Sequence, residues 1–201
     1  AAFNRLRLRL RKQPDEQLYA LKKEQLRLLE QQVLVQDFDL FYGDATRVSE
    51  KGYVPYGWQF KDEEVSIPAH RGKGINLFGL YDRNNNFHYW LEPESINADK
   101  IVTILDEFSW KINRRTVVVL DNASPHRSKK VRQMIPYWEQ RGLHLFFLPP
   151  YSPQLNIVER LWKEIKARYL QPQDYISADD LFYSLSRICA NIGIELGLRW
   201  K

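Results

Sequence analysis

The sequence contains a single cysteine, Cys189, and no long hydrophobic run. One cysteine excludes an intramolecular disulfide framework and any zinc module built from several cysteines. Because Cys189 lies among Leu185, Ile188 and Ile192, we expect it to be a small, buried apolar residue. No apolar stretch approaches the length needed to span a bilayer, and no signal peptide is visible. We therefore expect a soluble, intracellular protein with no membrane partner.

The motifs of several common enzyme classes are also missing. The glycine-containing turn at residues 70–74 lacks the GxxxxGK[ST] arrangement, so it is not a phosphate-binding P-loop. Ser124 and His126 are not part of a GxSxG elbow, which argues against a serine hydrolase. No internal repeat or low-complexity segment is visible. A chain of 201 residues, 44% of them hydrophobic, is long enough for one globular domain with a substantial core.

Acidic residues are absent from the first twelve positions. Residues 1–12 contain five basic side chains, whereas the rest of the chain has 25 basic and 25 acidic ones, so the net charge of +5 comes from this arm. Leucines alternate with the basic residues, which predicts an edge strand with one packed and one cationic face. A concentrated basic arm favours contacts with DNA phosphates. The candidate DNA-contacting residues are Arg5, Arg7, Arg9, Arg11 and Lys12, together with Arg71 and Lys73 of the turn.

Hydrophobic periodicity predicts an α/β fold. Strands are expected at residues 33–44, 75–81, 87–91, 117–120 and 143–148. Helices are expected at residues 14–32, 97–112, 129–141, 158–169 and 178–191, with Pro136 bending or breaking the third. Hairpin strands followed by strand–helix–strand crossovers imply a mixed five-stranded sheet flanked by helices. We divide the chain into a basic arm with a linker helix, residues 1–32, and one folded domain, residues 33–201.

Three acidic residues fall where predicted elements begin or end. Asp44 ends the first strand, Asp121 follows the fourth, and Glu159 lies in the first turn of the helix after the fifth. If the first and fourth strands are neighbours, Asp44 and Asp121 lie side by side, and Glu159 can join them. Carboxylates placed in this way can hold hard divalent cations. Each acid alone could instead cap a turn or interact only with a helix dipole, so the hypothesis depends on the three together.

The residues around these acids resemble DDE transposases of the mariner-like superfamily, most closely its bacterial insertion-sequence branch. Residues 119–128, VLDNASPHRS, are similar to the motif of the second acid. Residues 148–162, LPPYSPQLNIVERLW, are similar to the motif of the third acid. The segment FYGD at residues 41–44, followed by YGW at 56–58, is similar to that of the first. The resemblance covers residues 33 to 169.

Two positions depart from the pattern of that branch. Ala45 stands where a glutamate is common, and Ile157 stands where proline is usual. Neither departure removes a presumed ligand.

The resemblance implies a ribonuclease-H-like fold and a DNA transposase. Such an enzyme hydrolyses phosphodiester bonds at transposon ends and transfers the freed strands into target DNA. The resemblance assigns catalysis and metal binding to Asp44, Asp121 and Glu159, with two Mg²⁺ ions per site and Mn²⁺ as a substitute. The same motifs contain three further candidate site residues, ranked below the acids: Asn122, His126 and Asn156. His126 either contacts DNA phosphate or a metal-bound water, or is a structural turn histidine.

The family also implies partners. These are double-stranded DNA, both as transposon terminal repeats and as target, and a second copy of the chain when DNA ends are bound. Residues 33–201 would be the catalytic domain, preceded by a helix-turn-helix region absent here, in a cytoplasmic, nucleoid-associated bacterial protein. The alternatives are another ribonuclease-H-like nuclease, or a non-catalytic DNA-binding protein derived from a transposase. The PPYSPQLN segment and the basic arm argue against the former, and the three retained acids argue against the latter.

Overall fold

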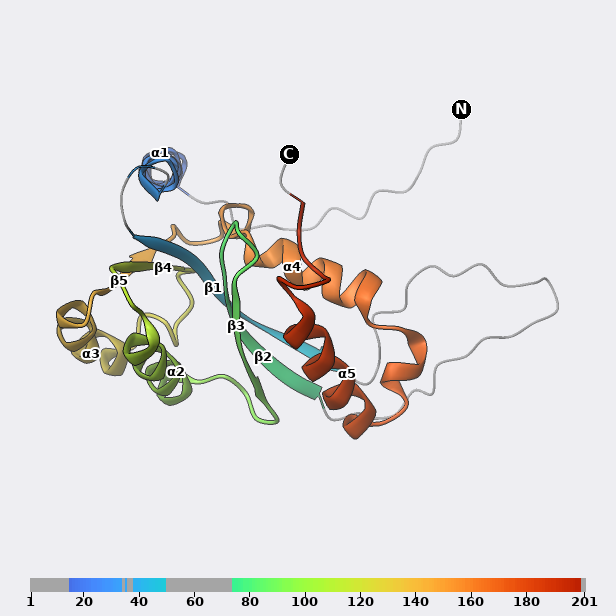
Figure 1. Cartoon of the computed structure of the whole chain (residues 1–201). Helices are drawn as coiled ribbons and strands as arrows, with labels where there is room; N and C mark the ends of the chain where they lie inside the picture. Colours follow the sequence, from blue (N-terminus) through green and yellow to red (C-terminus); the bar gives the residue numbers. More distant parts are fainter. Residues whose placement is uncertain (1–14, 34, 36–37, 50–73, 200–201) are drawn as a thin grey trace, which may run out of the picture.

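A mixed five-stranded sheet forms the centre of the protein (Figure 1). The computed structural model describes residues 15–33, 35, 38–49 and 74–199. The sheet order is β3-β2-β1-β4-β5, in which β1 pairs antiparallel with β2 and parallel with β4. The hairpin partner β3 and the last strand β5 complete the two sides. The strands are β1 Asp39–Ser49, β2 Gly74–Tyr81, β3 Phe87–Glu92, β4 Thr116–Leu120 and β5 Leu143–Phe147.

Helices cover both faces of this sheet, as the sequence predicted. They are α1 Glu16–Val33, α2 Ala98–Lys111, α3 Lys129–Gln140, α4 Val158–Glu164 and α5 Ala178–Asn191. Pro136 lies inside α3, which continues to Gln140 without a break. The helix predicted at 158–169 changes character after α4, because Ile165–Tyr169 forms a π-helical turn. The predicted order of strands and helices is confirmed.

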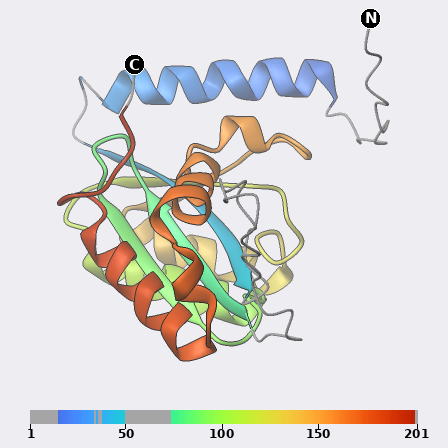
Figure 2. The same ribbon diagram turned by 90° about the vertical axis from the view of Figure 1, so that its right-hand side faces the viewer.

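Two hydrophobic cores follow from the alternation of side chains along the strands. On one face Tyr42 and Leu77 pack against α4 and α5, and on the other Phe41 and Phe78 pack against α2 and α3. Figures 1 and 2 show α2 and α3 on one side of the sheet, α4 and α5 on the other, and α1 lying across one end of the molecule. Cys189 of α5 is 2% exposed in the first core, and burial raises its pKa to about 12. The prediction of a buried cysteine is confirmed.

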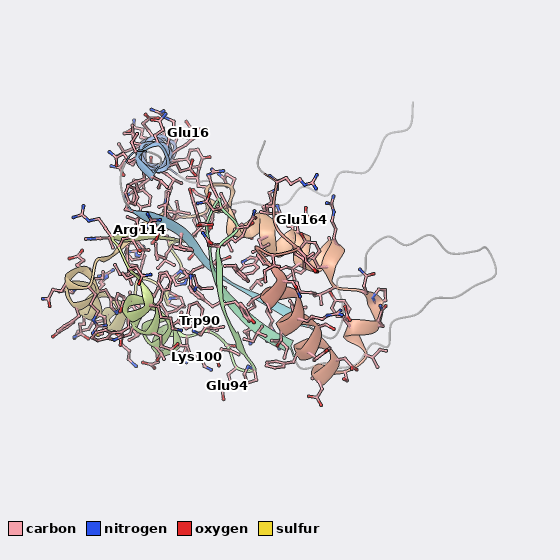
Figure 3. All side chains as sticks on the ribbon, in the orientation of Figure 1. Glu16, Trp90, Glu94, Lys100, Arg114 and Glu164 are labelled. Atoms are coloured by element: carbon pink, nitrogen blue, oxygen red, sulfur yellow. The ribbon has the colours of Figure 1, made fainter. Side chains whose placement is uncertain are left out.

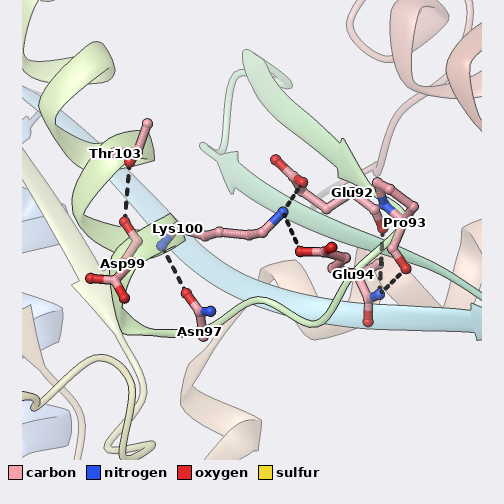
Figure 4. A network of polar contacts seen from close by, with 8 residues as sticks. Glu92, Pro93, Glu94, Asn97, Asp99, Lys100 and Thr103 are labelled. Atoms are coloured by element: carbon pink, nitrogen blue, oxygen red, sulfur yellow. Dashed lines mark hydrogen bonds and ion pairs between the residues drawn. The ribbon is translucent and has the colours of Figure 1, made fainter.

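Polar contacts fix the connection from β3 to α2 (Figure 4). Lys100 of α2 forms ion pairs with Glu92, at the end of β3, and with Glu94 at 3.8 Å. The backbone N–H of Lys100 donates to the side chain of Asn97 at 3.0 Å, which caps the helix. These contacts hold α2 on the face of the sheet where Trp90 also packs (Figure 3).

The predicted bounds of the first strand are wrong at both ends. Val33 belongs to α1, and β1 begins at Asp39 and continues to Ser49. Asp44 was predicted to end the strand because the apolar run stops there. The structure instead continues β1 through a ladder with β2, from Tyr42 to Ser49. Asp44 therefore lies in the middle of a long central strand.

Some predictions fall outside the described residues. The basic arm at residues 1–12 and the turn with Arg71 and Lys73 are among them, so their contacts with DNA stay predictions.

No helix in the described part of the chain is long and apolar enough to cross a membrane.

Candidate active site

The first two acids are brought together by the register of β1 and β4. Gly43 of β1 is the partner of Leu120, the last residue of β4. Asp44 and Asp121 are the next residues on these neighbouring parallel strands, so they lie at the level where β4 ends. Beyond this level β1 continues alone against β2. The sequence left open whether these strands are neighbours, and the structure pairs them in parallel.

Glu159, the third acid, is brought to the same region by the contacts of Asn156, a residue that is 3% exposed. The side-chain amide of Asn156 donates to the carbonyl of Gly43 at 3.1 Å, and its amide oxygen accepts from the N–H of Val158 at 3.3 Å. These bonds attach the start of α4 to the β1 residue that precedes Asp44. Glu159 lies in the first turn of α4, where an acid is favoured by the helix dipole.

A cavity of about 500 Å³ lies beside two of the acids. Asp121 and Glu159 both line it, between the loop that follows β4 and the loop that follows β5. The carboxyl ends of parallel strands are where ligands bind in open α/β sheets. The remaining walls come from the same two loops, including Asn122, Arg127, Tyr151 and Asn156.

Asp44 is oriented by Trp162 of α4, whose indole N–H donates to its carboxylate at 3.2 Å. The ring of Trp162 can reach Asp44 because Gly79, the cross-strand partner of Asp44 on β2, has no side chain. A Cβ atom at Gly79 would lie 2.6 Å from the Trp162 ring and 2.5 Å from the ring of Phe87. The glycine is therefore required by the close approach of the two rings.

The three carboxyl groups differ in their electrostatic surroundings. Burial, followed by the negative charges of Glu159 and Asp121, raises the pKa of Asp44 to about 7. Burial also raises the pKa of Glu159, although Lys163 and Lys166 oppose the shift. Two of the three acids are thus destabilised in their charged form, which is the state that binds a cation.

Asp121 is held in its charged form by its neighbours. Burial alone would raise its pKa, but His126, whose Nδ1 lies 2.6 Å from Asp121 Oδ1, and the N–H of Ala123 at 3.1 Å lower it below the ordinary value. His126 is 3% exposed and packs edge-on against Phe78. His126 is therefore held in the protein interior, and its contact with Asp121 orients the carboxylate of that aspartate.

Asn122 lies next to Asp121 and lines the cavity. Its amide oxygen is buried and has no hydrogen-bond partner within the described part of the protein. Buried acceptors are nearly always paired in folded proteins, so an orphan at a cavity wall calls for an explanation.

Lys166 was not predicted from the sequence. Its ammonium group donates to the hydroxyl of Thr46 at 2.6 Å, and Thr46 lies two residues after Asp44 on the same face of β1. Burial lowers the pKa of Lys166, while Glu159 and Asp44 act in the opposite direction. The sequence could have pointed to Lys166, because it lies seven residues after Glu159, two helical turns further along the same helix face.

The donor chemistry of the acids fits a hard divalent cation. Carboxylate oxygens are the ligands that Mg²⁺ and Mn²⁺ prefer, and the raised pKa values of Asp44 and Glu159 are what an added positive charge would reverse. Among the residues that the structure describes, no three acidic, histidine or cysteine side chains are grouped tightly enough to hold an ion. The side chains of Asp44 and Asp121 are directed instead to Trp162 and His126.

We expect the metal-free protein to lose stability as the pH rises, because of Asp44. The pKa of about 7 in the folded protein lies above the ordinary 3.8, so the folded state binds the proton more tightly than the unfolded state between these values. Stability therefore falls from about pH 4 to about pH 7 and stays low above it. Melting temperatures in EDTA should show this slope, and Asp44→Asn should flatten it. An equal slope in the variant would contradict the prediction.

Comparison with known proteins identifies the family. The profile of the DDE superfamily endonucleases matches residues 39–182, well over half of the chain. An uncharacterized protein of Sinorhizobium fredii, y4pE/y4sA, is 31% identical over 85 residues, which are 42% of this chain and 56% of that protein. This chain thus spans little more than half the length of that relative.

Solved structures show the same fold. The Mos1 mariner paired end complex with Mn has a TM-score of 0.64 at 16% identity, covering 94% of this chain and 59% of that one. The Mos1 paired-end complex with the left transposon end gives 0.61 at 16% identity, with the same coverage. The catalytic domain of Mos1 gives 0.55 at 15% identity, covering 90% of this chain and 85% of that one.

These similarities confirm two predictions made from the sequence. The five-stranded sheet with its flanking helices has the ribonuclease-H-like fold of the Mos1 catalytic domain. The resemblance to DDE transposases is supported by the family match and by this fold. The chain belongs to the DDE superfamily of endonucleases.

Proposed function

We propose that this chain is the catalytic part of a DNA transposase. It cuts phosphodiester bonds at the ends of a mobile element and joins the freed 3′ ends to target DNA. The observation that carries the proposal is that Asp121 and Glu159 line one cavity and that the charges of both act on the neighbouring Asp44. The family match and the fold of Mos1 transposase support it.

Asp44, Asp121 and Glu159 are the residues that would hold the divalent ions, Mg²⁺ or, as a substitute, Mn²⁺. Divalent ions bound by these carboxylates would supply activation of a water or sugar hydroxyl and stabilisation of the leaving oxygen. The Mn and Mg complexes of Mos1 support this choice of metals.

The residues around the three acids set the position and the charge of their carboxyl groups. His126 keeps Asp121 ionised and fixes its direction, and Trp162 fixes that of Asp44. Asn156 holds the start of α4 against β1 and so sets the position of Glu159. Lys166 places a positive charge beside the acids, where it can neutralise an oxygen of the phosphate that is cut. No side chain needs to act as a nucleophile, because water and then a 3′-hydroxyl attack the phosphate.

The proposed partners are the terminal repeats of the element, target DNA and a second copy of the chain that holds the other end. Mos1 has been seen in paired-end complexes with a transposon end and in a strand transfer complex, which supports the proposal. The basic arm at residues 1–12 would add contacts with phosphates. Because the chain spans 59% of the Mos1 chain, further parts of the protein would read the DNA ends. We place the protein in the bacterial cytoplasm, at the nucleoid.

The test is cleavage of a duplex carrying the terminal repeat of the element that encodes the protein, compared with a duplex of shuffled sequence. In Mg²⁺, the full-length protein should cut the first at the element boundary and leave a 3′-hydroxyl, and should cut the second far more slowly. Equal cutting of both would favour another nuclease of this fold. No cutting by the folded, full-length protein would favour a non-catalytic DNA-binding protein.

A further inference from the structure

A segment without acidic residues follows Asp121. Residues 122–138 contain no aspartate or glutamate, and their lysines and arginines lie within six positions: Arg127, Lys129, Lys130 and Arg132. Lys130 forms an ion pair with Asp99 of α2. The other three side chains are exposed and have no hydrogen-bond or ion-pair partner in the part of the chain that the structure describes. These three residues form the α3 basic surface.

The α3 basic surface begins at the wall of the candidate active site. Arg127 lines the same cavity as Asp121 and Glu159. Lys129 and Arg132 lie in the first turn of α3, which starts two residues later. We propose that this surface binds the phosphates of the target duplex where that duplex meets the site of strand joining. The inference rests on the proposed function and assigns one of its two DNA substrates to named residues.

The stability of α3 does not account for these charges. The N-terminal end of a helix carries a partial positive charge, so acids are favoured in its first turn and cations are not. The first turns of α2 and α5 contain acids, as this rule predicts. The first turn of α3 contains none, and Lys129, Lys130 and Arg132 add positive charge to its positive end. Unpaired cations at such a place, beside a candidate DNA site, indicate an anionic partner.

The chemistry of the surface fits phosphate oxygens. Lysine and arginine donate charge-assisted hydrogen bonds to phosphate, and contacts of this kind carry no information about the bases. Reading a base edge requires a side chain held in a defined orientation. Because no neighbouring group in the described part of the protein binds these three side chains, the surface suits a duplex that is bound whatever its sequence. A target duplex is bound in this way.

The place of α3 in the fold favours the target over the element end. Val131 of α3 packs in the core that α3 shares with α2, whereas Leu26 of α1 packs in the core that contains α4 and α5. The basic arm precedes α1 in the chain, so an element end bound by the arm would reach the cavity from the α1 side of the sheet. Strand joining requires both duplexes at the same carboxylates, and the α3 side is then open to the second one.

The test measures how the end-loaded protein binds a second duplex. The full-length protein is first bound to terminal-repeat DNA with a free 3′ end, in calcium so that no strand is joined. The probe is a duplex of arbitrary sequence, and its affinity is measured over a range of salt concentrations. Lys129→Gln combined with Arg132→Gln should weaken its binding by about tenfold and reduce the slope of log K against log salt by about two. The affinity for the terminal-repeat DNA should change by about twofold or less.

Two matched variants make the test specific. Lys111→Gln combined with Arg187→Gln removes the same charge from exposed positions of α2 and α5 that do not line the cavity, and should have little effect on the probe. Lys129→Arg combined with Arg132→Lys keeps both charges and should keep the affinity. The melting temperature of the glutamine variant of α3 should not fall, because neutral side chains remove an unfavourable interaction with the helix dipole.

The outcomes separate this proposal from the proposed function. An unchanged affinity of the α3 glutamine variant for the arbitrary duplex, or an equal loss in the α2 and α5 control, overturns the proposal. A larger loss for terminal-repeat DNA than for the arbitrary duplex assigns the surface to the element end and also overturns it. Failure of the proposed function is seen in a different assay, in which the folded, full-length protein cuts no terminal-repeat DNA in Mg²⁺.

Discussion

Replacing Glu159 with glutamine is expected to slow the cleavage of end-bearing DNA by at least about a thousandfold. Glutamine keeps the size of the side chain and its position in the first turn of α4, but it has no negative charge with which to hold a divalent ion. Single-turnover cleavage in Mg²⁺ measures the effect. Glu164→Gln is the matched control on the same helix, because Glu164 pairs with Arg168 at 3.1 Å and does not line the cavity.

The same substitution should make the metal-free protein more stable. Because the pKa of Glu159 is raised by burial, its ionised form is disfavoured in the folded state at neutral pH. A neutral glutamine removes this cost, so the melting temperature in EDTA should rise while cleavage is lost. A variant that cuts DNA at the normal rate would show that Glu159 is not a ligand. One that melts earlier and does not cut would point to a structural role.

Gly79→Ala is expected to lower the free energy of unfolding by about 1–3 kcal/mol, as overpacking in a well-packed core does. The new Cβ atom would lie 2.5 Å from the Phe87 ring and 2.6 Å from the Trp162 ring, so one of the rings must move. Trp162 also holds Asp44, and its displacement should therefore reduce cleavage as well. Denaturation in urea, followed by single-turnover cleavage, measures both effects.

Two comparisons make this prediction specific. Gly74→Ala on the same strand places a Cβ atom 2.5 Å from the side chain of Arg47, which can move, and 3.0 Å from the Val48 carbonyl, so its effect should be smaller than that of a clash with two packed rings. Trp162→Phe combined with Gly79→Ala should cost less than the sum of the single changes, because the smaller ring leaves room for the methyl group. Additive effects, or an unchanged stability in Gly79→Ala, would contradict the packing described for this face of β2.

The sequence was sufficient to place two of the three acids. Asp121 follows a short apolar run that is typical of a buried strand, and this run ends where β4 ends. Glu159 lies in the first turn of a helix with a clear apolar face, and that pattern begins where α4 begins. Asp44 was placed at a strand end because an acid interrupts the apolar run. Its true position in mid-strand follows from the ladder between β1 and β2, which is a long-range contact.

The residues that were missed owe their roles to tertiary packing. The position of Trp162 in the helix pattern predicts a core residue. Its hydrogen bond to Asp44 becomes visible only when α4 is packed against β1 in the folded protein. Gly79 lies between Phe78 and Leu80 in β2, and the absence of a side chain there is required by the rings of Phe87 and Trp162, which pack against it only in the folded protein. Lys166 becomes part of the site because Thr46 of β1 anchors it.

Manganese binding is the most direct test of the claim that three acids form one metal site. Electron paramagnetic resonance counts the ions bound to the full-length protein on its terminal-repeat DNA. We expect Asp44→Asn, Asp121→Asn and Glu159→Gln each to weaken binding by about tenfold or more, and the exposed Asp179→Asn on α5 to leave it unchanged. Equal binding by the unsubstituted protein and all three site variants would contradict the claim.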